Sequence, residues 1–283
     1  MVDFGVSIFP TDYSIQPAEL ARAVEEHGFE SLWVTEHTHI PASRQSPWPG
    51  GPNLPQEYWH THDPFVALAA AAAVTTRIRL GTGILLVPEH DPIVAAKSIA
   101  SLDRVSNGRL VVGIGAGWNA EEMANHGVAF ADRWKVTRER VEAWRTIWTE
   151  EEASYHGKYV DFDRIWSYPK PVQPGGPPVL LGAQTPWGYQ RVIDYCDGWM
   201  PIFGRSDLGE GLQHLRTLAD KAGRDMRTIQ LAVFGARDSE KGVGTLIEQG
   251  FQRIVLGLPA APAAEVLPVI ERYAQFAEHM RKG

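Results

Sequence analysis

The chain has 283 residues, a length typical of one α/β barrel domain. Hydrophobic residues make up 44% and charged residues 22%, which is ordinary globular composition and excludes a disordered chain. Lysine and arginine number 27 against 34 aspartates and glutamates, so the net charge of −7 argues against binding to nucleic acid or an anionic membrane. One cysteine excludes an internal disulfide, and with no visible signal peptide we expect a cytoplasmic protein.

Short apolar runs alternate with amphipathic runs along the whole chain. We expect eight strands, over Phe4–Phe9, Ser31–Thr35, Arg79–Leu86, Arg109–Ile114, Val179–Gly182, Gly198–Ile202, Ile229–Phe234 and Arg253–Gly257. We expect eight helices after them, over Pro17–His27, Pro64–Thr75, Asp91–Ser106, Arg133–Glu150, Pro186–Cys196, Leu208–Ala222, Ser239–Gln249 and Ala264–Ala277. Helices between strands imply parallel pairing, and eight such units predict a single (β/α)8 TIM barrel domain over residues 1–283. An open doubly wound sheet is the alternative.

Two long segments interrupt this alternation. Ile40–His62 is rich in proline, glycine and tryptophan and follows the second strand. Glu151–Pro178 follows the fourth helix and contains a predicted hairpin around Tyr155–Tyr159, and an extra short helix is expected within Asn119–Asp132. Loops this long are usually functional, so we expect long inserted loops at the C-terminal face of the strands, where barrel active sites lie.

Glu36 and His37 come directly after the second strand and are the candidate catalytic residues. An imidazole titrates near neutral pH, so a histidine at a strand end can donate or accept a proton in a pocket. The alternative is that His37 only satisfies backbone groups of its loop.

Two His-x-His pairs, at residues 37–39 and 60–62, also suit a zinc site. Barrel metallohydrolases, however, carry such a pair on the first strand and an aspartate after the last. Here the pair follows the second strand and no carboxylate follows the eighth, so we expect no metal site.

Two glycine-rich turns are candidate ligand sites. Gly113, Gly115 and Gly117 do not form a dinucleotide fingerprint, because Trp118 stands where its third glycine belongs. These glycines would instead let backbone approach a flat or phosphorylated ligand, and the alternative is a tight turn without a ligand. Gly182–Pro186 begins a helix directly after a strand, and the N-terminus of a helix favours an anion. The alternative is a turn with proline at the helix start and no ligand.

Aromatic residues are frequent in the loops of one end of the predicted barrel. We expect some of them to wall a pocket for a planar ring, while others seal loops onto the barrel. They are Trp48, Trp59, Trp118, Trp166 and Trp187.

Taken together, several of these stretches resemble the bacterial luciferase-like flavin and deazaflavin oxidoreductases. They are Gly28–His37, Leu80–Gly83, Ser101–Arg109, Gly115–Asn119 and Glu122. The sequence of residues 36–41, EHTHIP, most resembles that of the branch that uses the deazaflavin coenzyme F420. The resemblance implies a TIM-like barrel with the cofactor across the C-terminal ends of the strands.

The resemblance further implies hydride transfer between coenzyme F420 and a small organic substrate. His37 would donate or accept the proton, and Glu36 would orient His37. The alternative is a monooxygenase that uses O2 and reduced FMN from a partner flavin reductase. A cofactor-binding protein without turnover and a metal-dependent hydrolase are more distant alternatives.

In this family the cofactor ring lies at a bulge near the end of the third strand, which contains a non-proline cis peptide matching Gly83–Ile84. The phosphate of the cofactor meets the turn after the fifth strand. Cofactor contacts are thus expected from Thr82, Gly83, Ile84, Gly115, Gly117, Trp118, Asn119, Gly182, Ala183, Gln184 and Thr185.

Three further expectations accompany the resemblance. The sugar-phosphate dehydrogenase branch carries tryptophan four residues after the matching histidine and glutamate in place of Trp118, whereas this chain has Pro41, so sugar-phosphate oxidation is not expected. The substrate is instead expected to be set by Ile40–His62. A homodimer through the second and third helices is expected, with the alanine-rich Phe65–Val74 face at the two-fold axis.

Overall fold

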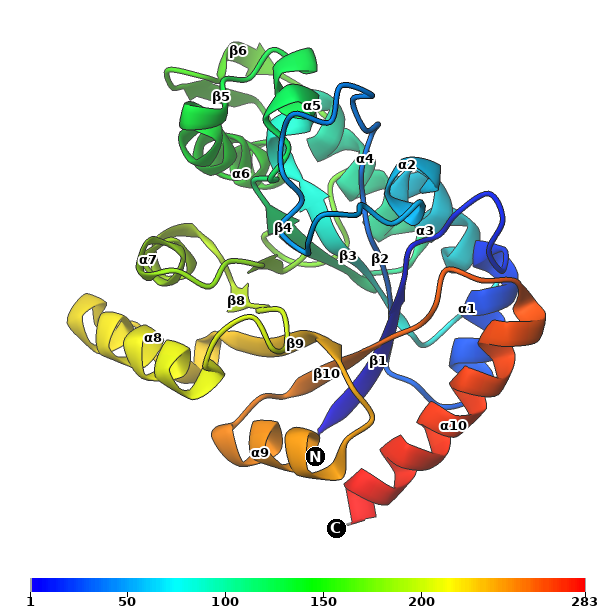
Figure 1. Ribbon diagram of the computed structural model, residues 1–283. Coiled ribbons are helices and arrows are strands. Elements are labelled where there is room, and N and C mark those ends of the chain that lie inside the picture. The colour runs from blue at the N-terminus through cyan, green and yellow to red at the C-terminus, as the bar shows by residue number, and fades with distance from the viewer. Residues whose placement is uncertain (1, 283) are drawn as a thin grey trace.

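Eight strands pair in parallel and close into a barrel, in the order β1-β10-β9-β8-β7-β4-β3-β2 (Figure 1). The structure is a computed structural model that describes residues 2–282. The barrel strands are β1 (Asp3–Ile8), β2 (Ser31–Val34), β3 (Arg79–Leu86), β4 (Leu110–Gly115), β7 (Val179–Leu181), β8 (Gly198–Trp199), β9 (Gln230–Ala236) and β10 (Arg253–Gly257). The closed ring confirms the predicted (β/α)8 TIM barrel and excludes the open sheet.

Helices follow the strands and cover the outside of the barrel (Figure 1). The outer helices are α1 (Pro17–Glu26), α3 (Pro64–Ala72), α4 (Pro92–Val105), α6 (Arg133–Thr149), α7 (Pro186–Tyr195), α8 (Leu208–Ala222), α9 (Glu240–Gln249) and α10 (Ala263–Lys282). Short elements are α2 (Glu57–His60), α5 (Ala120–Asn125) and the 3-10 turns η1 (Val87–Glu89), η2 (Phe130–Asp132) and η3 (Met226–Thr228). The predicted extra helix within 119–132 is thus confirmed as α5 and η2, whereas α2 was not expected.

Local sequence explains where several helices begin and end. Proline occupies the first turn of α1, α3, α4 and α7, where its missing N–H costs no hydrogen bond. Asp63 and Asp91 cap α3 and α4 by accepting hydrogen bonds from backbone N–H groups. Gly28, with a φ of 75°, ends α1 as its position predicted.

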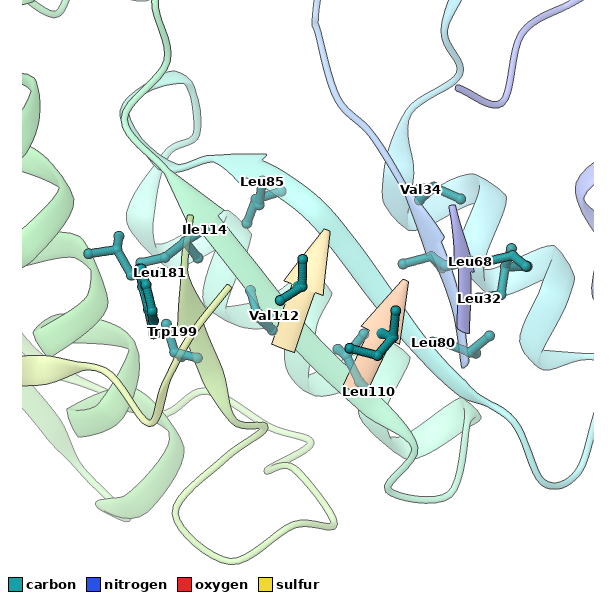
Figure 2. Packing of buried hydrophobic residues seen from close by; sticks show 14 of the residues in the cluster. Leu32, Val34, Leu68, Leu80, Leu85, Leu110, Val112, Ile114, Leu181 and Trp199 are labelled. Atoms are coloured by element: carbon teal, nitrogen blue, oxygen red, sulfur yellow. The ribbon is translucent and has the colours of Figure 1, made fainter. Parts of the chain in front are cut away.

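Alternate side chains of each barrel strand enter two separate layers of the core. One set faces outward and packs against the helices, as Leu32 and Val34 of β2 do beside Leu68 of α3 in Figure 2. The other set fills the inside of the barrel and consists of Trp33, Val111, Leu180, Met200, Ala232 and Val255. Because both faces are buried, the strands consist almost wholly of apolar residues.

Trp33 is the largest side chain inside the barrel and is fully buried. Its indole N–H donates to the hydroxyl of Ser31 at 2.8 Å. A Cβ atom on Gly81, on the neighbouring strand β3, would lie 2.2 Å from the indole ring. Gly81 therefore leaves the space that this tryptophan occupies.

The two long segments occupy different places. The chain from β2 to α2 crosses the same end of the barrel as α5, above the C-terminal ends of the strands (Figure 1). The predicted hairpin is confirmed as β5 (Ala153–His156) paired antiparallel with β6 (Asp161–Ile165). It packs along α6, where the hydroxyl of Tyr155 donates to Glu142 at 2.7 Å. Only the first segment therefore extends over the mouth of the barrel.

Within residues 2–282, no helix has the combination of length and apolar character that a membrane crossing requires.

Candidate active site

A cavity of about 370 Å³ opens at the C-terminal ends of the barrel strands. This volume lies within the range of about 300–1,000 Å³ that is usual for small-molecule and cofactor sites. Its lining is mainly apolar and includes Phe9, Trp48, Pro49, Tyr58, Ile84, Leu86, Trp118, Trp134, Ile202, Phe234 and several glycines. Its polar side chains are Thr35, Glu36, His37 and Arg205.

A bulge in β3 shapes the floor of the cavity. The register between β3 and β4 shifts between Thr82 and Leu85, and the Gly83–Ile84 peptide bond is cis, which confirms both features expected there. Ile84 lines the cavity, and a Cβ atom on Gly115 would lie 1.9 Å from its Cδ1 atom. A side chain at Gly115 would therefore displace Ile84 from the floor.

His37 forms a buried pair with a carboxylate from a distant part of the chain. Its Nδ1 atom lies 2.8 Å from Oε2 of Glu122, and the two side chains are 5% and 0% exposed. Oε1 of Glu122 accepts a hydrogen bond from the backbone N–H of Thr38 at 3.0 Å. Burial opposes the charge of Glu122, but hydrogen bonding to His37 and the charge of His37 outweigh it, and the pKa of Glu122 is lowered.

This pairing fixes which nitrogen of His37 can react. A carboxylate only accepts hydrogen bonds, so the Nδ1 atom must carry the hydrogen that faces Glu122. The lone pair of a neutral His37 ring is then on Nε2, which has no hydrogen-bond partner among residues 2–282. His37 can therefore accept a proton at Nε2 while Glu122 stabilises the imidazolium.

Glu36 was expected to orient His37, but its carboxylate bonds other groups. Its Oε1 atom lies 2.6 Å from Nε2 of His90, and its Oε2 atom accepts the N–H of Leu86 at 2.5 Å. Burial lowers the pKa of His90, but the hydrogen bond and charge of Glu36 outweigh it, so that pKa is raised. The carboxylate that orients His37 belongs to Glu122 instead.

A third buried acid, Glu89, ends η1 beside these two pairs. It is 6% exposed, and neither carboxylate oxygen accepts a hydrogen bond within the described chain. Burial and the charges of Glu122 and Glu36 raise the pKa of Glu89 well above its ordinary range.

The short helix α5 also holds the loop over the cavity. Glu121, next to Glu122, accepts the backbone N–H of Ser46 at 2.7 Å and the hydroxyl of Ser43. In return, the hydroxyl of Ser46 accepts the N–H of Ala120 at 3.0 Å. Two adjacent glutamates of one helix thus hold His37 and the loop.

Eight of the thirteen catalytic and cofactor-contact candidates line the cavity: Glu36, His37, Gly83, Ile84, Gly115, Gly117, Trp118 and Gly182. Two others have structural partners instead. Thr82 is fully buried and donates to the carbonyl of Gly113 at 2.8 Å. Asn119 caps α5 by accepting the N–H groups of Glu121 and Glu122.

The turn after β7 is built by its own side chains. Thr185 caps α7, and the carbonyl of Ala183 accepts the indole N–H of Trp199. The amide of Gln184 bonds both the N–H and the carbonyl of Ile202, which joins this turn to the loop after β8. Within residues 2–282, the backbone N–H groups of residues 183–185 donate no hydrogen bond.

Of the loop tryptophans selected from the sequence, Trp48 and Trp118 line the cavity, whereas Trp59, Trp166 and Trp187 are 48%, 77% and 75% exposed and lie outside it.

Several cavity residues were not found from the sequence. Phe9 and Phe234 could have been found, because each ends a predicted barrel strand. Tyr58 and Arg205 had no such signal: Tyr58 lies on α2, and its ring centroid is 5.1 Å from that of His37.

The paired histidines have other partners. His39 bonds Asn125, and His60 lies 2.9 Å from Asp12. In the described part of the chain, no group of three or more His, Cys, Asp or Glu side chains is arranged to hold a metal ion.

The chain belongs to the luciferase-like monooxygenase family, whose model matches residues 16–279. An uncharacterized protein of Mycobacterium tuberculosis is 40% identical over 274 residues, which cover 96% of this chain and 97% of that protein. The 5,10-methylenetetrahydromethanopterin reductase of Methanopyrus kandleri is 26% identical over 306 residues, with coverage of 100% and 80%. A solved F420-dependent secondary alcohol dehydrogenase, in complex with an F420-acetone adduct, has a TM-score of 0.78 at 18% identity, with coverage of 97% and 98%. At that identity the structural likeness shows the fold alone.

Proposed function

We propose that this protein is an oxidoreductase that transfers a hydride between coenzyme F420 and a small organic substrate. The observation that carries this proposal is the buried His37–Glu122 pair at the wall of an apolar cavity, with Nε2 of His37 left without a protein partner. When bound, the deazaflavin supplies the hydride chemistry at C5 of its ring, and the protein supplies position and proton transfer.

The cavity fits a flat, largely apolar ring. Its floor combines glycine backbone with the side chain of Ile84, and aromatic side chains including Tyr58 and Trp118 stand around it. A ring that lies on Ile84 would be within reach of His37, which lines the same cavity. Gly115 and Gly182 leave room for the Ile84 side chain at the floor of the cavity, since a Cβ atom on either would contact it.

The turn after β7 is the proposed seat of the phosphate. Ala183, Gln184 and Thr185 offer unpaired backbone N–H groups at the start of α7, where the helix dipole favours an anion. Arg205 lines the cavity from the loop that Gln184 ties to this turn. Gly182, which begins this turn, lines the cavity as Arg205 does, and a guanidinium and free N–H groups both favour negative charge.

The role of His37 is proton transfer at Nε2. In the direction of alcohol oxidation, Nε2 accepts the hydroxyl proton of the substrate as the hydride leaves the neighbouring carbon. Glu122 stabilises the imidazolium through Nδ1, and in reduction the same proton returns to the substrate oxygen. Glu36 supports the end of β3 through Leu86 and acts on this chemistry indirectly.

The choice of coenzyme F420 over FMN is supported by relatives. The deazaflavin is favoured by the sequence EHTHIP at residues 36–41 and by the F420-dependent dehydrogenase that has the same fold. The description of the family as monooxygenases favours FMN as the second candidate.

A titration of the purified protein with F420 and FMN, each oxidised and reduced, tests this choice. We expect F420 to bind at least about tenfold more tightly, a difference of about 1.4 kcal/mol. Tighter binding of FMN, with O2 consumption when reduced FMN is supplied, would replace this proposal by the monooxygenase.

We also propose a homodimer through α3 and α4. Val66 on α3 and Val94 on α4 are 68% and 62% exposed, which is unusual for apolar side chains on neighbouring helices. A cytoplasmic location stays a prediction, based on the single cysteine.

A further inference from the structure

Aromatic side chains that follow three different strands meet around Tyr58 at one wall of the cavity. The ring centroid of Tyr58 lies 4.7 Å from that of Phe9 and 5.6 Å from that of Trp48. The centroid of the Trp118 ring lies 5.8 Å from that of His37 and 6.4 Å from that of Tyr58. These four aromatic residues are half-buried and line the cavity together with His37, so each has ring surface left for a ligand.

Tyr58 is held at this wall by the chain that follows it. The N–H of His62 donates to the carbonyl of Pro10 at 2.7 Å, and the N–H of Asp12 donates to the carbonyl of His60 at 3.3 Å. The end of α2 is thereby joined to the loop after β1, two residues from Tyr58. A wall that the fold fixes in advance needs little ordering when a substrate binds.

Three charged side chains line the cavity. Two of them, Glu36 and His37, are each paired with another side chain. The third is Arg205, and its neighbour Ser206 accepts a hydrogen bond from Gln184 at 2.8 Å, which places Arg205 next to the turn proposed for the cofactor phosphate. A carboxylate on the substrate would then have no cation of its own at the aromatic wall.

We propose that the substrate is an uncharged alcohol, or the matching ketone, with an aromatic group on the reacting carbon, and that the ring of Tyr58 selects this group. This inference rests on the proposed function. The substrate hydroxyl must reach His37, whose ring lies beside those of Tyr58 and Trp118, so a group on the reacting carbon lies among these rings. An aromatic group packs well there, whereas a charged group would lose its hydration without gaining a partner.

Three alcohols test the substrate class, with F420 as the oxidant. Mandelate carries a carboxylate where α-methylbenzyl alcohol carries a methyl group, and isopropanol carries a methyl group in place of the phenyl ring. Each oxidation passes a hydride from the carbinol carbon to F420 and the hydroxyl proton to His37, and leaves a ketone. We expect kcat/KM for α-methylbenzyl alcohol to exceed that for mandelate at least about a hundredfold and that for isopropanol at least about tenfold. A preference for mandelate would overturn the proposal and assign Arg205 to the substrate.

Substitution of Tyr58 tests the role of its ring. Tyr58→Phe keeps the ring, so KM for α-methylbenzyl alcohol should change less than about threefold. Tyr58→Ala removes the ring, so this KM should rise at least about tenfold, while KM for isopropanol and Kd for F420 change less than about threefold. Tyr58→Leu also lacks a flat ring and gives the same comparison if Tyr58→Ala does not fold. Trp59→Ala, at an exposed position of the same helix, is the control and should change none of these constants. An equal loss for both alcohols, or a larger loss of F420 affinity, would overturn the role of Tyr58.

A binding measurement separates failure of this proposal from failure of the proposed function. Acetophenone and benzoylformate, the ketones of the first pair of alcohols, are titrated by ligand-observed NMR into the protein loaded with F420, or with FMN if FMN binds more tightly. Tighter binding of acetophenone, weakened at least about tenfold by Tyr58→Ala, would support the substrate class even if F420 is never reduced. Equal or tighter binding of benzoylformate, or acetophenone binding that is absent or insensitive to Tyr58→Ala, would overturn it.

Discussion

The Nδ1 atom of His37 lies 2.8 Å from Oε2 of Glu122, although the two residues are 85 positions apart in the sequence. The barrel makes this contact, because β2, β3 and β4 are neighbours and α5 follows β4 at their C-terminal ends. The candidate active site is thus assembled from segments that meet only in the closed ring.

Replacement of His37 tests the proton transfer. His37→Ala should lower kcat by about 10²–10⁴-fold, since it removes the general acid–base, while F420 affinity changes less than about tenfold. Steady-state kinetics and a binding titration measure the two effects, with His279→Ala, on the exposed side of α10, as the control. Near-normal turnover in His37→Asn would remove His37 from the catalytic role, and lost binding in His37→Ala would give it a binding role.

Two neighbouring glycines of β4 should respond differently to alanine. At Gly115 the new Cβ meets the end of the Ile84 side chain, which can turn into the cavity, so F420 affinity should fall at least about tenfold. At Gly113 the Cβ would lie 2.2 Å from the backbone carbonyl of Thr82, which cannot yield as easily, so stability should fall by about 1–3 kcal/mol. Thermal unfolding and titration of both variants separate the effects, and unimpaired binding by Gly115→Ala would contradict the proposed ring seat.

The pair of His90 and Glu36 should contribute stability that depends on pH. The pKa of His90 is raised in the folded state, so its contribution is complete below the ordinary histidine pKa of about 6.5 and is lost as pH rises through the raised value. His90→Asn should therefore cost about 1–3 kcal/mol at pH 6 and less at pH 9. Urea unfolding at both pH values measures this, and an equal loss at both would show that the ion pair is not the cause.

Arg205 should contribute to cofactor affinity through its charge. Arg205→Gln should weaken F420 binding about tenfold at low salt, with a smaller effect at high salt, because added ions screen an exposed charge. Arg22→Gln, at an exposed position of α1, is the matched control. Titration at two salt concentrations measures the difference, and identical affinities for the two variants would exclude Arg205 from the phosphate site.

The proposed dimer depends on the exposed valines of α3 and α4. Val66→Asp together with Val94→Asp should give a monomer at micromolar concentration, because two charges cannot be buried cheaply at an apolar interface. Trp166→Asp, at a side chain that is 77% exposed near the β5–β6 hairpin, should leave the mass unchanged. Light scattering measures the mass, and a monomeric unmodified protein would end the proposal.

The alternation of apolar runs and capped helices predicted nearly all of the barrel, because burial on both faces of a strand and capping of a helix are local signals. The pairing of side chains was harder. Adjacent residues in extended backbone point in opposite directions, so Glu36 and His37 lie next to each other in sequence and have different partners. Glu89 gave no signal at all, because a buried acid and a solvated acid look alike in sequence.

The two adjoining glutamates of α5 have a consequence for how this enzyme could acquire new substrates. Glu121 holds the loop at Ser46, and Glu122 holds the histidine independently. The stretch from Pro47 to Gln56 lies beyond the anchor and lines the cavity through Trp48 and Pro49, so we expect its exchange to reshape the cavity while the hydrogen bond between His37 and Glu122 stays in place. A library confined to that stretch would explore substrate scope on an intact reaction centre.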